Sequence, residues 1–379
     1  MLILSIDFKY LILDDYFITR EVALKKEWLL KTLALGIIIL FIGAGVVSAF
    51  NVKPYNEFEP MSDGNWLYVG GSGEGNYTRI QDAIDNASDG DTVFVYDDSS
   101  PYVENIVVDT SIYLLGEEKN TTIIDGATNG HGVNISADNV TIVGFSIQNC
   151  SNGSGICIYS NNTIITDNII SYNKIGIETY YGGDSYDPTA ILSCGYNTIT
   201  NNLIIGNEGL GIGLSGKNNT VNGNIISQTQ YGIMLALAVT NNISNNFISE
   251  NEDGIFIVGS YNNVIYRNNI SKNEKLGVSI FCTSLDKILQ NNFIKNGQNA
   301  YFSQPLFIRA RILKRFFSLP IKQSIWDGNF WNRPRLLPYK VRGYISLIRG
   351  PDIEPPYSVN IFQFDWHPAF KPYDIPIGG

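Results

Sequence analysis

The chain has 379 residues, of which 44% are apolar and 16% charged, and its formal net charge is −10. This composition provides enough apolar side chains for a large buried core. The negative charge argues against a nucleic-acid partner, because neutralising phosphates requires clustered Lys and Arg. The charge is uneven: from Leu306 onward eleven basic and five acidic residues give a net charge of +6, which leaves −16 for the residues before it.

An uncharged run of nineteen residues, Thr32 to Phe50, follows Lys25, Lys26 and Lys31. Basic residues before an apolar stretch that ends in small residues are typical of a secretory signal peptide. The run is also just long enough to cross a bilayer as an uncleaved anchor. We therefore predict an extension with a signal peptide or membrane anchor at residues 1–50 and a linker at residues 51–75. The rest of the chain is expected outside the cell or at its surface.

Residues 77–115 are expected to begin the folded domain. Ile80, Ala83, Ile84 and Ala87 have the spacing of a short amphipathic helix, and residues 92–96 alternate as a strand does. A stacked solenoid has an open core at each end. We therefore expect this helix to cover the N-terminal end of a solenoid.

A repeat with a period of about 22 residues follows. One track is an Asn with an Ile two positions later, and a second is a Gly followed by an alternating apolar strand, as in residues 254–257. Stacked in parallel at ~4.8 Å, such short strands satisfy one another's backbone groups and join their Ile and Val side chains into one core. We predict an all-β fold, a right-handed parallel β-helix over residues 76–305.

The recurring asparagines are interpreted as a structural Asn ladder, in which each amide bonds its equivalents in the coils above and below. An amide does not titrate, so this track is not a catalytic candidate. The predicted ladder consists of Asn168, Asn202, Asn224, Asn246, Asn268 and Asn292.

The step from Asn168 to Asn202 is 34 residues, which marks an insertion at residues 180–193. Insertions on one face of a solenoid often mark its binding side. This one is aromatic and acidic, a composition that suits sugar rings, and a loop without function is the alternative. The candidate carbohydrate-binding residues here are Tyr180, Tyr181, Asp184, Tyr186 and Asp187.

The segment of residues 306–379 is basic and rich in Pro and Trp. Proline cannot donate to a strand ladder, so it is suited to ending a solenoid. We predict that this segment is a cap that folds back along the coils. The alternative is a separate module in which Trp326, Trp331 and Trp366, together with Arg side chains, bind carbohydrate or an anionic envelope component.

Sequons and cysteines leave alternatives open. Eleven Asn-X-Ser/Thr sequons are compatible with a glycosylated exported protein, but a chain rich in Asn, Ser and Thr also contains them by chance. The four cysteines include no Cys-X-X-Cys pair. They allow three disulfide pairings or unpaired buried thiols. They are Cys150, Cys157, Cys194 and Cys282.

Several segments carry a family resemblance. IQDAI, DGDTVFVY, SIYLLGE and TTIIDG lie between residues 80 and 126, and VTIVGFSIQN begins at Val140. Together they resemble the NosD-like parallel β-helix repeat family, over about residues 75–305. The resemblance implies a pectate-lyase-like solenoid and a cell-surface setting. It implies no single function, because the same repeat occurs in copper-maturation factors, surface-layer proteins and polysaccharide lyases, hydrolases and epimerases.

Copper would need imidazole or soft sulfur ligands. The chain has His131, His367, three Met and four Cys, with no cluster of them along the sequence. The sequence therefore argues against a copper-maturation role. We predict no metal site and no cofactor; calcium stays open, although no motif indicates it.

Catalytic residues are not identified by the sequence. Gly130-His131-Gly132 matches part of a pectinase-type motif without its paired Asp residues or basic triplet, and His131 is interpreted as an exposed turn residue. Asp187-Pro188 resembles the start of an epimerase motif, but Thr189 stands where that motif has His. A carboxylate pair is geometrically possible. Its candidates are Asp125, Asp138, Asp167, Glu178 and Asp184.

We predict a non-catalytic, exported envelope protein that binds or displays polysaccharide. One alternative is a polysaccharide-active enzyme, a lyase or epimerase rather than a hydrolase. The other is a structural surface-layer component. The oligomeric state is left open.

Overall fold

The computed structural model describes residues 64–180, 194–307, 323–348 and 357–376. All of them belong to one unit, Pro60–Gly379. Residues 32–50, the predicted signal peptide or anchor, lie outside the described residues. Within those that are described, no helix combines the length and the apolar character that crossing a membrane requires.

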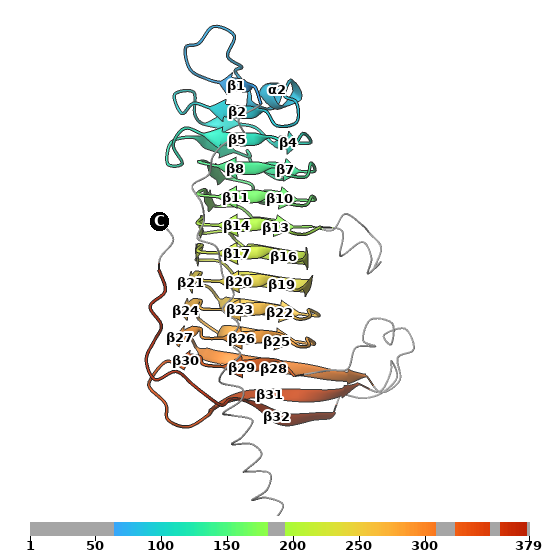
Figure 1. Cartoon of the computed structure of the whole chain (residues 1–379), viewed down its shortest axis with the longest axis vertical. Helices are drawn as coiled ribbons and strands as arrows, with labels where there is room; N and C mark the ends of the chain where they lie inside the picture. The colour runs from blue at the N-terminus through green and yellow to red at the C-terminus, as the bar shows by residue number, and fades with distance from the viewer. Residues whose placement is uncertain (1–63, 181–193, 308–322, 349–356, 377–379) are drawn as a thin grey trace, which may run out of the picture. The chain divides into compact units, whose positions relative to one another are not determined.

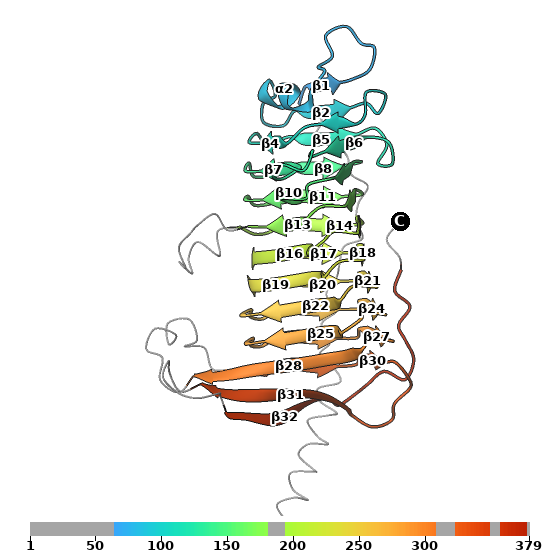
Figure 2. The same ribbon diagram turned by 180° about the vertical axis from the view of Figure 1, so that it is seen from behind.

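Short parallel strands are stacked coil on coil, and most coils contribute one strand to each of three rows (Figures 1 and 2). Row 1 contains β1 (Trp66–Val69), β2 (Thr92–Val95), β5 (Tyr113–Gly116), β8 (Thr141–Val143), β11 (Ile164–Thr166), β14 (Thr198–Thr200), β17 (Thr220–Asn222), β20 (Asn242–Ser244), β23 (Val264–Tyr266), β26 (Lys287–Leu289) and β29 (Ile325–Asp327). Row 2 contains β3 (Tyr102–Val103), β6 (Ile123–Asp125), β9 (Ser146–Gln148), β12 (Ile169–Ser171), β15 (Leu203–Ile205), β18 (Ile225–Ser227), β21 (Phe247–Ser249), β24 (Asn269–Ser271), β27 (Asn292–Ile294) and β30 (Phe330–Trp331). Row 3 contains β4 (Ile106–Val108), β7 (Val133–Ile135), β10 (Ser154–Ile158), β13 (Ile175–Thr179), β16 (Leu210–Lys217), β19 (Tyr231–Val239), β22 (Asp253–Val258), β25 (Leu276–Phe281), β28 (Gln298–Phe307) and β31 (Tyr339–Ile348).

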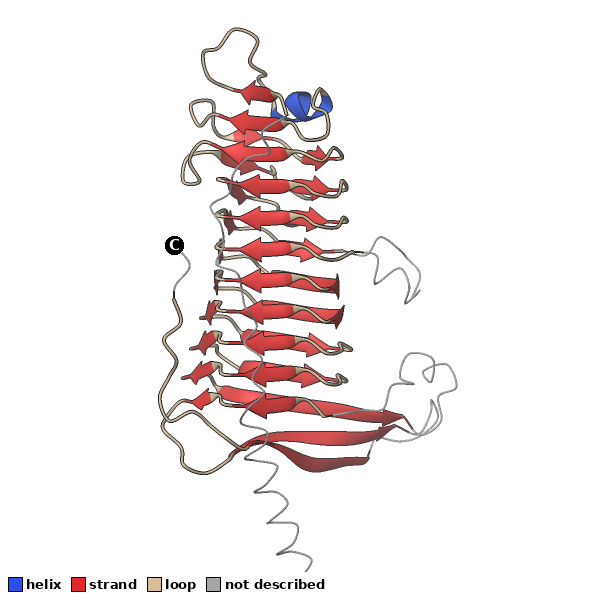
Figure 3. Ribbon diagram, in the orientation of Figure 1, coloured by secondary structure: helices blue, strands red, loops and turns tan. Residues whose placement is uncertain are grey.

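Strands of one row pair in parallel, so equivalent residues of successive coils lie side by side. Ile165 in β11, for example, lies beside Ile142 in β8 and Ile199 in β14. One coil takes about 23 residues, close to the predicted 22. Figure 3 shows strands along the whole stack, with a helix at its N-terminal end. The predicted parallel β-helix is therefore confirmed.

The core is a set of aliphatic columns inside the stack. In row 2 the middle residue of each three-residue strand points inward, as Ile170, Ile204 and Ile226 do, and these side chains are fully buried. β-Branched residues suit this role, because they pack well on a pleated surface. Each buried Ile contributes about 1.5–3 kcal/mol. The repeated Ile of the sequence is thus accounted for by packing.

The corner between rows 1 and 2 explains the recurring Asn. In each coil from Asp167 to Gly328 a residue with positive φ bends the chain, and a buried Asn follows it, as in Gly223-Asn224 and Asn245-Asn246. The side-chain oxygen of Asn246 accepts the backbone N–H and the Nδ2–H of Asn224, both at 3.0 Å. Its own Nδ2 donates to Asn268 at 2.9 Å and to the Val221 carbonyl at 3.0 Å. The buried amides thereby satisfy backbone groups that a strand ladder cannot reach.

Five of the six predicted ladder positions lie in this row, but Asn292 does not. The hydrogen bonds run from Asn268 to Asn291, then to Asn329, and end at Asp365. This coil is one residue longer than its predecessor, and Gln290, with φ of 52°, is the residue that turns the corner. The ladder residue is therefore Asn291, and the inward residue two positions later is Phe293 rather than Ile294.

Two further amide rows, which the sequence analysis missed, occupy the other corners. One runs through Asn197, Asn219, Asn241 and Asn263 and ends at Asp286. The other includes Asn173–Asn207 and the series Asn251, Asn273 and Asn296. All three corners of the coil are therefore held by buried side-chain amides.

The N-terminal end is covered by α2 (Ile80–Asp85), which buries Ile80, Ala83 and Ile84. Glu104, from the next coil, accepts the backbone N–H groups of Ile80 and Gln81 at 2.9 and 3.1 Å. These donors have no partner within the first turn of a helix, and a carboxylate is favourable there. The stack itself begins earlier than predicted, because β1 starts at Trp66, inside the segment expected to be a linker.

The stack also continues past residue 305, where the predicted cap begins. β29 and β30 add strands to rows 1 and 2. β32 (Tyr357–Asp365) pairs antiparallel with β31 and also contacts β29, so it joins rows 1 and 3 into one sheet. The tail of residues 366–376 runs back along the coils (Figure 1), and Tyr373 exchanges two backbone–side chain hydrogen bonds with Asn292, at 2.8 and 2.9 Å.

Replacing Asn246 by Ala should destabilise the protein by about 3 kcal/mol or more, because several buried donors and acceptors lose their partner together. The matched control is Asn222→Ala, since the Asn222 amide makes one hydrogen bond, to Ser244 in the next coil. We expect that variant to lose less than about 1 kcal/mol. Urea unfolding at pH 7 measures both, and equal losses would show that the buried amides carry no special weight.

Asp286 ends its amide row with a fully buried carboxyl, and its Oδ2 has no hydrogen-bond partner among the described residues. Burial raises the pKa of this carboxyl. A carboxyl whose pKa is higher in the folded than in the unfolded state stabilises the fold when the pH is below its unfolded-state pKa. This stabilisation is lost as the pH rises through its folded-state pKa. The free energy of unfolding of the Asp286→Asn variant should therefore be about 1 kcal/mol higher than that of the wild type at pH 7. The difference should shrink towards pH 4.

Asp365→Asn is the contrasting control. Both oxygens of Asp365 accept from donors, including Trp331 Nε1 at 2.8 Å and the Gly328 amide at 3.2 Å. An amide nitrogen would face these donors, so this variant should be less stable than the wild type at both pH values. Thermal melts at pH 4 and pH 7 compare the two. If Asp286→Asn is also less stable than the wild type at pH 7, ionised Asp286 does not destabilise the folded state.

Candidate functional site

The outer face of row 3 carries side chains that the repeat does not explain. In β10, Ile156 and Ile158 point into the core, so Cys157 between them points to the outer side. The register places Cys157 between Asn134 of β7 and Glu178 of β13. His131 lies in the turn just before β7. Three successive coils thus each bring a different polar side chain to one place.

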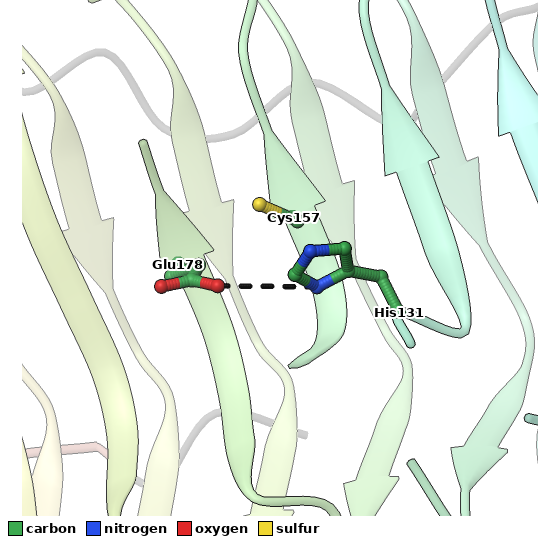
Figure 4. A group of neighbouring side chains, drawn as sticks. All are labelled: His131, Cys157 and Glu178. Carbon is green, nitrogen blue, oxygen red and sulfur yellow. Dashed lines mark ion pairs between the residues drawn. The ribbon is translucent and has the colours of Figure 1, made fainter. Parts of the chain in front are cut away.

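His131, Cys157 and Glu178 form a compact group (Figure 4), and their ligand atoms all lie within 4.8 Å of one another. The Nδ1 atom of His131 is 3.9 Å from Oε1 of Glu178. The His131 and Glu178 side chains are 29% and 19% exposed, and Cys157 is fully buried. Solvent therefore reaches the group through His131 and Glu178, whereas the thiol is buried.

Neighbouring polar groups complete the site. The Ser154 backbone N–H donates to His131 Nδ1 at 3.1 Å, and the Ser154 hydroxyl donates to Glu178. The Oδ1 atom of Asn134, beside Cys157 in the register, is buried and has no hydrogen-bond partner within the described chain. An orphaned buried acceptor of this kind costs about 1–3 kcal/mol and calls for an explanation such as a bound ion.

The electrostatics keep the thiol protonated as the site stands. Burial raises the pKa of the Cys157 thiol, and the Glu178 carboxylate raises it further. Burial likewise raises the pKa of the hydroxyl of Tyr159, which directly follows β10. A cation bound next to the sulfur would reverse this effect, because a coordinating thiol loses its proton.

The donor set suits a soft or borderline metal ion. Imidazole and thiolate are ligands of copper and zinc, whereas sites for magnesium or calcium use oxygen alone. Two ligand atoms of a tetrahedral ion, bound at 2.0–2.3 Å, lie about 3.3–3.8 Å apart. Nδ1 of His131 and Oε1 of Glu178, 3.9 Å apart, are close to this spacing, and the other ligand atoms, all within 4.8 Å, would move closer together when an ion binds.

The sequence shows no cluster of His, Met and Cys along the chain, and we interpreted His131 as an exposed turn residue. The structure places His131 in the turn before β7, but its side chain is 29% exposed and lies beside Glu178. The three residues are 26 and 21 positions apart in the sequence, with no motif spacing, and the stacking of coils brings their side chains together. The available signal was the register: Cys157 and Glu178 follow equivalent Gly-Ile pairs at Gly155 and Gly176.

Of the residues predicted in the insertion, the structure describes one. Tyr180 lies directly after β13 and is exposed, and its ring meets the ring of Tyr159 edge-on at 5.3 Å. Both rings lie at the end of the strands that carry Cys157 and Glu178. The other four predicted residues lie outside the described part of the chain: Tyr181, Asp184, Tyr186 and Asp187.

The three predicted tryptophans do not form one platform. Trp326 and Trp331 are 3% and 0% exposed, so they belong to the core and cannot stack on an external ligand. Trp331 lies between the rings of Phe293 and Tyr339, with centroids 4.5 and 3.9 Å away. It closes the core of the last coils. Trp366, 64% exposed, is the one that remains accessible.

The other candidate residues are also placed. The sequence left open whether the four cysteines form disulfides. In the structure all four are free thiols. Asp167 forms an ion pair with Lys119, and the Asp138 carboxylate accepts the backbone N–H of Asn161 at 2.7 Å. Of the described candidate acids, Glu178 is the one that lies beside a histidine.

Comparisons with known proteins bear on this fold. A family model described as "Periplasmic copper-binding protein (NosD)" matches residues 84–336. Among curated proteins, no sequence matches. Solved structures that are similar include pectate lyase Pel9A, with 15% identity, a TM-score of 0.48, and coverage of 63% of this chain and 74% of that one.

Two further structures are similar to a comparable degree. The XylC–xylose complex has 13% identity, a TM-score of 0.48, and coverage of 64% of this chain and 69% of that one. The Azotobacter vinelandii mannuronan C-5 epimerase AlgE4 A-module has 14% identity, a TM-score of 0.40, and coverage of 59% and 86%. These similarities assign no activity to this chain. The family model, in contrast, covers more than half of its residues, and the chain therefore belongs to the NosD family of parallel β-helix proteins.

Proposed function

We propose that this protein is an exported β-helix protein that binds one metal ion at His131, Cys157 and Glu178, with copper as the first candidate. The observation that carries the proposal is the convergence of these three side chains, one from each of three successive coils, within 4.8 Å. The unpartnered buried oxygen of Asn134 beside them supports it. The description of the NosD family as copper-binding agrees with an imidazole and thiol donor set.

The stack itself would organise such a site. Cys157 and Glu178 stand on strands whose backbones are hydrogen-bonded in register, and this holds their spacing near that of neighbouring strands. Ser154 contacts both His131 and Glu178, so it orients these two side chains. An ion bound at Nδ1 would compete with the Ser154 amide for that lone pair. Bound there, copper would be held on one side of a rigid sheet.

Cys157→Ser and His131→Gln should each weaken copper binding by more than about tenfold. Even replacing a residue that only hydrogen-bonds to a metal ligand typically lowers metal affinity 10–100-fold. Two matched controls are present in the chain: Cys282→Ser removes a half-buried thiol away from the site, and His367→Gln removes the other histidine. Both controls should bind within about twofold of the wild type.

The measurement is metal content after dialysis against copper or zinc alone, together with calorimetric titration. The wild type should retain one ion per chain, and thermal melts without metal should show that the variants fold. Stoichiometric binding that survives Cys157→Ser and His131→Gln would place the metal elsewhere. Absence of stoichiometric binding would refute the proposal.

Export is the second part of the proposal. The NosD family is described as periplasmic, which agrees with the predicted export of this chain. We propose that residues 32–50 act as the export segment, either removed as a signal peptide or kept as an anchor. Mass spectrometry of the N-terminus of the exported protein distinguishes the two.

Polysaccharide binding is the second candidate function. The observation that favours it is the exposed pair Tyr159–Tyr180 on the outer face of row 3, at the coil where the insertion begins. Tyrosine supplies a flat apolar face and a polar tip at low entropic cost. The enzymatic alternative, a lyase or epimerase, would use the neighbouring His131 and Glu178 as proton-transfer groups.

The double variant Tyr159→Ala and Tyr180→Ala should weaken binding of an oligosaccharide by about fivefold or more, because central aromatic contacts usually contribute over 1 kcal/mol. Tyr172→Ala is the control, an exposed tyrosine at the end of a row 2 strand. A glycan panel measures binding, and absorbance of unsaturated products tests for lyase activity in the same samples. Product formation would favour the enzyme over the binding protein. If the wild type, the double variant and Tyr172→Ala bind equally well, the tyrosine pair is not part of the binding site.

A further inference from the structure

A hollow lies on the outer face of row 3, at its C-terminal end. It has a volume of about 360 Å³, within the range of small-ligand sites. It is formed by β28 and β31 of row 3 and by β32, which pairs with β31. We call it the C-terminal hollow and define it by Gln298, Tyr301, Lys340, Arg342, Tyr344 and Phe362.

The register explains how these residues meet. Tyr301 in β28 lies beside Arg342 in β31, and Arg342 lies opposite Phe362 in β32. Cross-strand neighbours of this kind have Cβ atoms about 4.5–5.5 Å apart, so their side chains form one surface. The Tyr301 and Tyr344 rings are 5.9 Å apart, and the Lys340 ammonium lies 3.3 Å from the centre of the Phe362 ring.

The charge of the C-terminal hollow is unbalanced. Two cations line it, Lys340 and Arg342, and no carboxylate is among its lining residues. In the part of the chain that the structure describes, neither cation forms an ion pair with an acid. The segment from Leu306 onward has a net charge of +6, and two cations without an acidic partner in one hollow favour an anionic ligand.

The side chains that line the hollow indicate which class of anion it would bind. The Arg342 guanidinium can bind a carboxylate through two parallel hydrogen bonds. The Tyr301 hydroxyl is protonated at neutral pH and can donate a hydrogen bond, and burial raises its pKa further. The rings of Tyr301 and Tyr344 offer flat apolar faces, which a free inorganic anion does not need but a sugar ring does. A nucleic acid, in contrast, needs many clustered cations.

We propose that the C-terminal hollow binds a carboxylate-bearing sugar residue of an acidic polysaccharide, with Arg342 on the carboxylate and Tyr301 and Tyr344 against the ring. This inference rests on the second proposed function, polysaccharide binding, and adds its substrate class and a subsite for it. The hollow faces the same side of the solenoid as the Tyr159–Tyr180 pair, since both belong to row 3. A long chain along this face could therefore touch both.

The test is calorimetric binding of trigalacturonate, of its methyl ester and of inorganic phosphate to the full-length protein. The wild type should bind trigalacturonate at least tenfold more tightly than the ester or phosphate. Arg342→Gln should lose at least tenfold, because a charge-assisted hydrogen bond is removed. Arg333→Gln, which removes an exposed arginine outside the hollow, should lose less than threefold.

The outcomes separate the two levels of the proposal. If the wild type binds trigalacturonate and Arg342→Gln binds it equally well, the hollow is not the subsite, although polysaccharide binding stands. If phosphate binds as tightly as trigalacturonate, the hollow is a general anion site and the sugar assignment is wrong. If no glycan of the panel binds, both the subsite and polysaccharide binding are refuted. Thermal melts show whether the Arg342→Gln variant is folded.

Discussion

The whole structure depends on backbone hydrogen bonding between successive coils. Strands of three residues cannot be stable alone, so every coil needs a neighbour of the same shape on each side. The corners would break this pairing, because the chain bends there and leaves buried backbone groups without partners. Rows of buried asparagines, such as Asn224–Asn246–Asn268, fill that need at all three corners. The two ends need different solutions: α2 at one, and β32 with the Trp331 stack at the other.

The same constraint makes the candidate site. A stack in register places one residue of each coil in a column, whatever lies between them in sequence. The inward columns repeat aliphatic residues and the corner columns repeat Asn, whereas the outer column of row 3 changes from Asn134 to Cys157 to Glu178. Side chains that depart from a repeat are not needed for stacking, and they are the ones free to bind ligands. The C-terminal hollow follows the same rule, since Tyr301 and Arg342 are neighbours in that row.

The amide rows and the site also differ in how they treat polar burial. Asn246 is buried at little cost, because both its oxygen and its nitrogen find partners in adjacent coils. Asn134, at the candidate site, leaves its oxygen unsatisfied, and Asp286 does so at the end of an amide row. Buried polar groups whose hydrogen bonds are all made help to specify the fold. A buried polar group without a partner destabilises the folded state, and binding of a ligand or a proton can remove this penalty. This contrast separates structural polar residues from functional candidates.

The sequence by itself determined the fold class, because a period of about 22 residues with Ile in one track allows only a stacked solenoid. It also identified the N-terminal helix and most of one amide row, since these follow from local spacing at Ile80, Ala83 and Ile84 and at the repeated Asn. It placed Asn292 wrongly, because in Asn291-Asn292 only the residue after the positive φ of Gln290 turns inward. The burial of Trp326 and Trp331 and the convergence of His131, Cys157 and Glu178 were decided by the tertiary structure alone. Composition does not say which side of a strand faces the core, and contacts between coils depend on a register that a one-residue change in coil length shifts.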